Sequence, residues 1–365
     1  MKRYIYVATP WGPVGGGMYK VADYLIQAQD HVNGSAELHG LDTRGNGSAF
    51  LSFAYLVKSL WKILIGHISG NLAGVHINMA ERLSVLRKGL ILVFCRLLGI
   101  PTLLHLHAAQ FPQFYHALPV LFRSVIRQLF NMPEVCIVLG ESAKQFIHHE
   151  LLVPLDRIEI VINGVPPPII ARRKIDKAER QQILFLGNLS ERKGVSDLLN
   201  AIAIAKLNPD DVSVNLAGGG DIEKYKILAA TLGLNSLVCF KGWADQQIAS
   251  ALIAHADILI LPSYDEGLPL VILEAMANGV AVICTPVGEI PNFLTNKKNA
   301  CFVKPGDVNG IANAIREILE NKAVREMYEV NSKLLFNEMF SVNKFSGRIA
   351  EIHKCHFGVS AIHES

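Results

Sequence analysis

Residues 258–279 read ILILPSYDEGLPLVILEAMANG. The apolar run at 258–261 predicts a short buried strand, and the run from 270 to 278 predicts a helix. Pro269 suits the first turn of that helix, and Gly279 suits its end. A strand, a loop and a helix in this order are typical of a parallel α/β sheet, in which ligands bind beyond the carboxyl ends of the strands. We therefore expect chemistry in the loop between the strand and the helix.

The same alternation of apolar runs extends along the chain on both sides of this segment. It predicts an α/β fold with two Rossmann-like, doubly wound domains that face each other across a cleft. Three prolines at 166–168, followed by charged residues, predict a linker. We expect a first domain at 1–168, a second at 169–345, and a C-terminal helix or tail at 346–365 that packs back on the first domain. Further strands are predicted at 3–9, 73–77, 102–107, 134–139, 158–162, 182–186, 212–217, 237–240 and 280–284, and further helices at 18–29, 83–98, 195–206 and 222–232.

Composition excludes several classes of protein. The chain has 365 residues, of which 50% are hydrophobic and 18% are charged, so a disordered or coiled-coil protein is not expected. Lys and Arg number 35 against 32 Asp and Glu, a balance that does not favour a nucleic-acid partner. Charged residues interrupt the long apolar runs, so no membrane-spanning helix is expected. The six cysteines form no C-x-x-C pair and predict reduced thiols in a cytoplasmic compartment.

Two glutamates flank the loop and the helix of the opening segment. Glu266 precedes the helix, and Glu274 lies five residues beyond Pro269, about 7.5 Å along the helix axis. The backbone N–H groups of Leu270 and Val271 at the helix N-terminus favour a phosphate or a diphosphate. Carboxylates on two sides of a diphosphate can accept hydrogen bonds from a sugar and from a ribose. This layout indicates a sugar-nucleotide site, whereas glutamates without it would be a solvated loop residue and a helix-face charge.

Loops after three further predicted strands contribute candidate donor-binding residues. Arg192 and Lys193 follow one strand and are placed to neutralise a diphosphate. Gly218 follows a second strand, and Trp243 follows a third. Trp243 either packs near a nucleobase or is a structural tryptophan, and the sequence favours neither interpretation.

The first domain adds a glycine-rich loop and a histidine. The tripeptide Gly15-Gly16-Gly17 follows the first strand and allows backbone N–H groups to approach an anion or a sugar closely. Lys20 stands where a dinucleotide-binding G-x-G-x-x-G fingerprint needs glycine. His107 ends a strand and shares one face of it with His105. No Asp-x-Asp pair follows a strand and no further ligands surround the histidines, so we expect a site without a metal.

The spacing of Glu266 and Glu274 resembles the E-x7-E motif of retaining glycosyltransferases of family 4. The resemblance implies the GT-B fold, with the nucleotide sugar held mainly by the C-terminal domain. It implies that Glu266 contacts the donor sugar and that Glu274 contacts the ribose. The donor site that it implies comprises Gly15, Gly16, Gly17, Arg192, Lys193, Gly218, Trp243, Glu266, Gly267, Leu268, Leu270, Val271 and Glu274, and the catalytic residues are Glu266, His107 and Lys193.

Two positions depart from the family pattern. The family has G-R-L followed by K-G, and Lys193 matches its phosphate-binding lysine, but Asn188 stands at the position of the arginine. Arg192 is a candidate replacement for that arginine. Glu289 stands at the second glycine of the family's V-G-G-x-P stretch, where glycine permits close backbone approach.

The resemblance implies a retaining, metal-independent hexosyltransferase that uses a UDP- or GDP-linked donor and no further cofactor. Family members in O-antigen or exopolysaccharide synthesis often act on lipid-linked saccharides, so we expect such an acceptor and a peripheral location at the cytoplasmic face of the inner membrane. The segment 116–132, which contains Arg123 and Arg127, lies on an anionic membrane surface or is a core helix. A sugar-nucleotide epimerase on the same scaffold and a non-catalytic glycan-binding subunit are the alternatives.

Overall fold

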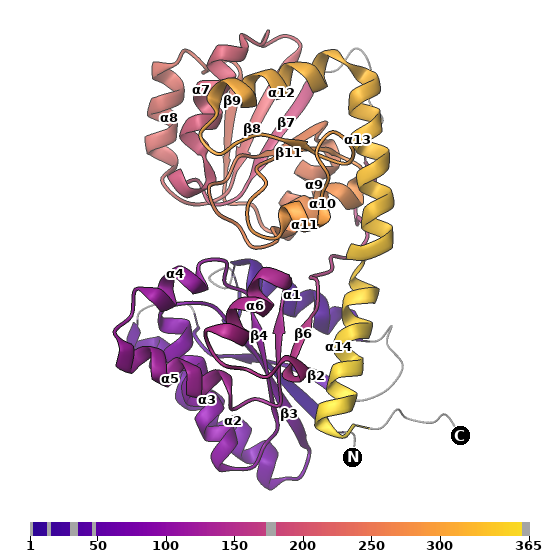
Figure 1. Cartoon of the computed structure of the whole chain (residues 1–365). Coiled ribbons are helices and arrows are strands. Elements are labelled where there is room, and N and C mark those ends of the chain that lie inside the picture. The colour runs from indigo at the N-terminus through magenta and orange to yellow at the C-terminus, as the bar shows by residue number, and fades with distance from the viewer. Residues whose placement is uncertain (1–2, 13–15, 30–35, 46–48, 173–179, 360–365) are drawn as a thin grey trace, which may run out of the picture. The chain divides into compact units, whose positions relative to one another are not determined.

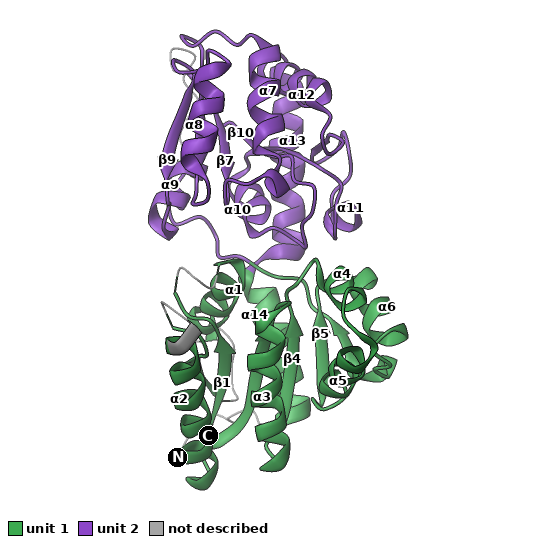
Figure 2. Cartoon of the chain, turned by 90° about the vertical axis from the view of Figure 1, so that its left-hand side faces the viewer, with its two compact units in different colours: residues 1–164, 342–365 green, residues 165–341 purple. Residues whose placement is uncertain are grey.

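The chain is divided into two compact units. The computed structural model describes residues 3–12, 16–29, 36–45, 49–172 and 180–359. Unit 1 comprises Met1–Gly164 and Val342–Ser365, and unit 2 comprises Val165–Ser341 (Figure 2). The long C-terminal helix α14 (Val342–Phe357) thus belongs to the same unit as the N-terminus, as its contacts with α1 show.

Unit 1 is built on a parallel sheet of six strands in the order β2-β1-β3-β4-β5-β6 (Figure 1). Side chains alternate along its inner strands, so that Val75 and Ile77 of β3 face the core under α3 while His76 faces α14. The elements are β1 (Tyr4–Thr9), α1 (Gly16–Gln27), β2 (Glu37–Asp42), α2 (Ala49–Ile68), β3 (Leu72–Met79), α3 (Leu83–Leu97), β4 (Thr102–Leu106), α4 (Phe111–His116), α5 (Val120–Phe130), β5 (Val135–Val138), α6 (Glu141–His149), η3 (Leu155–Arg157), β6 (Ile158–Ile160) and α14.

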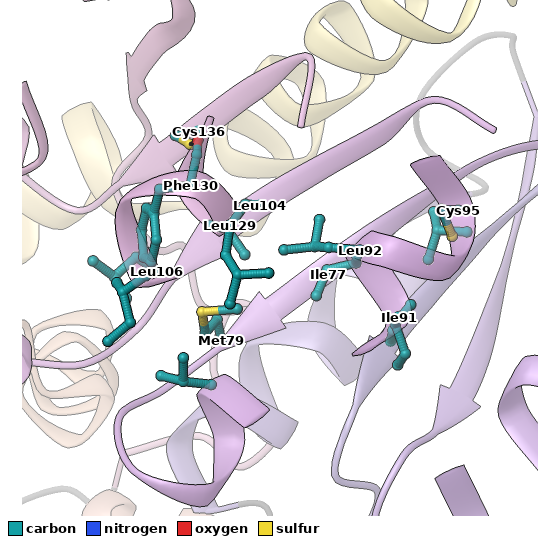
Figure 3. Packing of buried hydrophobic residues seen from close by; sticks show 14 of the residues in the cluster. Ile77, Met79, Ile91, Leu92, Cys95, Leu104, Leu106, Leu129, Phe130 and Cys136 are labelled. Carbon is teal, nitrogen blue, oxygen red and sulfur yellow. Dashed lines mark hydrogen bonds between the residues drawn. The ribbon is translucent and has the colours of Figure 1, made fainter. Parts of the chain in front are cut away.

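The core of unit 1 lies between the sheet and helices α3 and α5. Ile91 and Leu92 of α3 pack over Ile77 of β3 and Leu104 of β4, and Phe130 of α5 extends the same cluster (Figure 3). All five side chains are almost fully buried. Burying a side chain of this size stabilises the fold by about 1.5–3 kcal/mol.

Unit 2 repeats the architecture with the strand order β12-β11-β10-β7-β8-β9. Its strands pair in parallel throughout. Its central strands are buried on both faces, as expected when helices cover a parallel sheet on both sides. The elements are β7 (Gln181–Leu186), η4 (Glu191–Lys193), α7 (Val195–Ala205), β8 (Val212–Ala217), α8 (Ile222–Thr231), β9 (Val238–Gly242), α9 (Gln246–His255), β10 (Ile258–Leu261), α10 (Leu270–Asn278), β11 (Ala281–Cys284), α11 (Ile290–Phe293), β12 (Cys301–Phe302), α12 (Val308–Glu320), α13 (Lys322–Leu335) and the π-helical turn η5 (Phe336–Phe340).

Two doubly wound parallel sheets confirm the predicted fold class, and each predicted strand or helix lies within two residues of an observed one. Strand β2 was not predicted, because only Leu38 and Leu41 are buried in this edge strand. The sequence analysis expected no helix that could span a membrane. That expectation is wrong for α2, because its segment Leu51–Ile68 is long and apolar enough to cross a membrane. The cysteines are free, as predicted. Four of them are buried, and Cys239 and Cys355 are exposed.

Candidate functional site

The centre of the second sheet is a point where the chain changes direction. From β7 the chain continues outward through β8 and β9, and it then crosses to β10 on the other side of β7. The loops after β7 and β10 therefore lead away in opposite directions, and open α/β sheets bind their ligands at such a switch point. Lys193 lies in the loop after β7, and Glu266 lies in the loop after β10. The structure brings these two predicted catalytic residues together at the switch point of unit 2.

Lys193 and Glu266 form a largely buried ion pair. The Lys193 ammonium donates to Oε1 of Glu266, and the two side chains are 13% and 7% exposed. The same carboxylate oxygen accepts the Ser263 hydroxyl at 2.6 Å. Ser263 is itself positioned by Thr285 in the loop after β11, whose hydroxyl donates to the Ser263 carbonyl oxygen at 2.6 Å. A network that joins three loops therefore fixes the carboxylate of Glu266, and the sequence analysis missed its two hydroxyl residues.

Backbone contacts hold the loop after β7 against the loop after β10. Gly194 has a φ of +68°, and a Cβ atom there would lie 2.2 Å from the Pro262 carbonyl oxygen, so only glycine fits. Arg192 donates from Nη1 to the Asp265 carbonyl oxygen at 2.8 Å, and its own carbonyl oxygen accepts the Tyr264 N–H at 2.8 Å. Arg192 thus fastens the two loops beside the ion pair. Its replacement of the family arginine stays a prediction, since the guanidinium is bound here to a backbone carbonyl.

The loop after β11 packs against the backbone of Glu266. A Cβ atom on Gly288, whose φ is +59°, would lie 1.9 Å from the Glu266 carbonyl oxygen. Glu289 has a φ of −87°, a value open to any residue, and its N–H donates to the Gly267 carbonyl oxygen at 3.0 Å. Its carboxylate is buried and accepts the Asn292 side-chain N–H at 2.7 Å. Close approach thus requires glycine at 288 and tolerates the glutamate at 289.

The glycine-rich loop after β8 lies against the loop after β7. Gly218 has a φ of +140°, and a Cβ atom there would lie 1.9 Å from the Gly187 carbonyl oxygen. The Leu189 N–H donates to the Gly219 carbonyl oxygen at 2.7 Å. Trp243, after β9, borders Gly219 and keeps 57% of its surface exposed. A large exposed indole beside a glycine backbone is suited to stacking on a flat ring such as a nucleobase.

Helix α10 begins four residues after Glu266. Pro269 precedes its first turn, and Gly279 ends it in the left-handed conformation, as predicted. The first N–H groups of a helix have no acceptor within it, so those of Leu270 and Val271 point toward the end at which the loop of Glu266 arrives. Glu274 is half-buried one turn further along. Unit 2 therefore presents a cation, helix amides and two carboxylates at one edge of its sheet.

A family comparison identifies this arrangement. Residues 169–334, which include all of these loops, match the model of the family described as Glycosyl transferases group 1. Over these residues the chain is similar to the group 1 glycosyltransferases. The chain is also similar to an uncharacterized glycosyltransferase of Methanocaldococcus jannaschii, with 27% identity over 231 residues that make up 60% of this chain and 59% of the relative. The match to this relative spans 59% of its length, and the match to glycogen synthase of Mycobacterium tuberculosis spans 44% of that protein.

Solved structures show the same fold over nearly the whole chain. Sucrose-phosphate synthase from Thermosynechococcus elongatus has a TM-score of 0.77 at 17% identity and covers 98% of this chain and all of its own. HepE of Anabaena in complex with UDP and glucose has a TM-score of 0.76 at 17% identity and covers 97% of this chain and all of its own. The fold is GT-B, as the resemblance implied.

The remaining candidates lie in unit 1. Gly15 lies outside the described residues, while Gly16 and Gly17 form the exposed start of α1, and no described atom beyond the local chain lies within 4 Å of an added Cβ on either. His107 follows β4, and its Nε2–H donates to Asn78 Oδ1 at 2.7 Å. Its ring lies 4.0 Å from that of His105, so the two side chains share one face, as predicted.

Burial lowers the pKa of His107 to about 3, so its imidazole is neutral near pH 7. His105 belongs to a chain of buried histidines that the sequence analysis did not connect. His76 Nε2 lies 3.3 Å from His105 Nδ1, and His76 Nδ1 lies 3.1 Å from Nε2 of His353 in α14. Among the described residues, no group of three or more His, Cys, Asp or Glu has the geometry of a metal site.

Proposed function

We propose that this protein moves a hexose from a nucleotide-diphosphate donor to a saccharide acceptor with retention at the anomeric carbon. The observation that carries the proposal is the ion pair between Lys193 and Glu266 at the switch point of unit 2. The two groups neutralise each other in this structure, and each can bind a ligand instead: the ammonium an anionic group, and the carboxylate a hydrogen-bond donor. A sugar nucleotide offers both, because its diphosphate is anionic and its sugar hydroxyls are donors.

In the proposed reaction the bond between the anomeric carbon and the diphosphate oxygen breaks, and a bond from that carbon to an acceptor oxygen forms on the same face of the sugar. The acceptor proton leaves with the diphosphate. Lys193 and the amides of Leu270 and Val271 stabilise the charge that develops on the leaving diphosphate, while Glu266 holds the sugar. His107 is an uncharged contact residue in this scheme, because burial lowers its pKa and keeps the imidazole neutral, while its bond to Asn78 orients the ring.

UDP is the favoured nucleotide and a lipid-linked saccharide is the favoured acceptor class. The structural relative HepE binds UDP and glucose, which supports a UDP-sugar here. The acceptor proposal rests on the resemblance to polysaccharide-assembling family members. Free thiols at all six cysteines support a reducing, cytoplasmic location.

The test is a panel of UDP- and GDP-sugars incubated with the full chain, with and without a lipid-linked saccharide extract, and scored for released nucleotide and product mass. Release that depends on the acceptor supports the transferase. Isomerised donor without acceptor would establish the epimerase instead. Binding without turnover in the presence of the extract would support the non-catalytic subunit.

A variant of Glu274 tests the donor site separately. Glu274→Ala removes the carboxylate assigned to the ribose, and loss of a hydrogen bond to a charged group costs about 1.5–3 kcal/mol, or about 10- to 150-fold in affinity. Glu223→Ala on α8, an exposed helix-face glutamate, is the matched control. Calorimetry with UDP that gave equal affinities for the two variants would contradict the assignment of Glu274.

A further inference from the structure

Three helices of unit 1 carry most of the exposed apolar surface. Of the 26 large hydrophobic residues that are exposed in the described part of the chain, 15 lie on α2, α3 and α5. Helix α3 packs against α2 on one side and against α5 on the other (Figure 2). The exposed apolar residues of the three helices are Leu51, Phe53, Val57, Trp61, Ile65, Ile68, Leu83, Leu86, Leu90, Val93, Leu97, Val120, Leu121, Phe122 and Val125; we call them the apolar face.

The spacing of these residues places them on the outer sides of the helices. On α3 they recur at Leu86, Leu90, Val93 and Leu97, a helical stripe whose last member is 80% exposed. On α2 they include Trp61, which is 62% exposed. Monomeric soluble proteins rarely expose contiguous apolar patches larger than a few hundred Å², so a face that extends over three neighbouring helices indicates an interaction surface.

The charges on these helices have one sign. Helices α2, α3 and α5 contain no Asp or Glu. Lys58 and Lys62 of α2, Arg96 of α3 and Arg82 just before α3 are exposed among the apolar residues. Glu81, which precedes Arg82, is the anion next to these cations and is half-buried. A surface that combines exposed aliphatic and aromatic side chains with an excess of exposed cations complements the headgroups and acyl chains of an anionic bilayer.

The arginines of α5 have a different role from the one that the segment 116–132 suggested. Arg123 donates from Nε to the Leu118 carbonyl oxygen at 2.8 Å, and Arg127 donates from Nε to the Glu150 carbonyl oxygen at 2.8 Å. Both guanidinium groups thus bind backbone carbonyls of unit 1. The exposed cations of the surface come from α2 and α3 instead.

We propose that the apolar face of α2, α3 and α5, with Lys58, Lys62, Arg82 and Arg96, docks unit 1 on the surface of an anionic phospholipid bilayer. A twofold dimer through this face would bring two positively charged faces together, which disfavours a second copy. Insertion of α2 as a membrane span is disfavoured because its other side packs into unit 1 through Leu56 and Ile63, which are 3% and 0% exposed. The proposal concerns the location of unit 1 and is independent of the reaction.

The test is sedimentation of the full chain with lipid vesicles, without donor or acceptor, so its result does not depend on sugar transfer. We expect binding to vesicles of phosphatidylcholine with phosphatidylglycerol and weaker binding to phosphatidylcholine alone. Lys58→Gln with Lys62→Gln should lower the partition coefficient on anionic vesicles about 25-fold, because each cation near such a surface contributes about fivefold. Trp61→Ser with Leu90→Ser should lower it at least tenfold on either vesicle.

A matched control replaces exposed apolar residues elsewhere. Ile227→Ser with Val330→Ser in unit 2 removes similar exposed area and should bind like the wild type. Since all substituted side chains are exposed, the melting curves of all variants should coincide with that of the wild type.

Wild-type protein that stays in solution with anionic vesicles, or a control variant that loses as much binding as Trp61→Ser with Leu90→Ser, would overturn the proposal. A wild-type dimer that Leu90→Ser dissociates would assign the face to a second copy, and resistance to alkaline extraction would assign α2 to a span; either result overturns surface docking.

Discussion

Removal of Lys193 should destabilise unit 2 in a way that a second substitution repairs. In Lys193→Met the Glu266 carboxylate remains buried and keeps the hydrogen bond from the Ser263 hydroxyl, but it loses the cation that neutralised it. Removing one member of a buried ion pair costs about 3–5 kcal/mol. Because 1 kcal/mol shifts the Tm of a domain of this size by about 2–4 °C, we expect the Tm of unit 2 to fall by about 6–20 °C.

The double variant Lys193→Met with Glu266→Gln separates stability from activity. It buries two uncharged side chains, so most of the lost stability should return, with a coupling energy of at least about 2 kcal/mol in the cycle. Sugar transfer should not return, because neither the ammonium for the diphosphate nor the carboxylate for the sugar remains.

Denaturant unfolding measures the free energies of this cycle, and nucleotide release measures activity. Lys226→Met, which removes the exposed partner of Glu223, is the control and should change stability by less than about 1 kcal/mol. Additive destabilisation in the double variant would refute the reasoning, because it would mean that the two charges do not stabilise each other. Full activity in Lys193→Met would refute the proposed role of its ammonium.

Two further predictions concern the glycine contact and the buried histidines. Gly288→Ala should weaken UDP binding in calorimetry, whereas the control Gly233→Ala should not. Both glycines have a positive φ, but only a Cβ atom at 288 would meet the Glu266 carbonyl oxygen. Equal UDP affinities for the two variants would contradict this prediction. Burial lowers the pKa of His76, and it lowers the pKa of His353 to about 3. Below about pH 6.5 the unfolded chain therefore binds more protons than the folded chain. The free energy of unfolding of unit 1 should fall by up to about 1.4 kcal/mol for each histidine and each pH unit below that value. Hydrogen exchange of β3 at about pH 7.5 and 5.5 measures this loss, and unchanged protection would contradict it.

Local sequence determines the elements of this protein. Apolar runs bounded by turn residues specified the strand at Ile258–Leu261 and the helix at Leu270–Asn278, because both depend on periodicity and on the end signals Pro269 and Gly279. Strand β2 escaped detection because an edge strand buries only part of one face. The residue types of the motif also indicated a phosphate and sugar site before any geometry was known.

The contacts within the site depend on tertiary structure. Lys193 and Glu266 are 73 residues apart, and they meet because β10 pairs with β7 rather than with β9, the strand before it in the chain. The support from Thr285 requires β11 next to β10, and the chain of buried histidines requires α14 to return to β3. Strand order and helix docking arise from the burial of long-range apolar contacts, which no local pattern encodes, so residues far apart in the chain become partners only in the folded sheet.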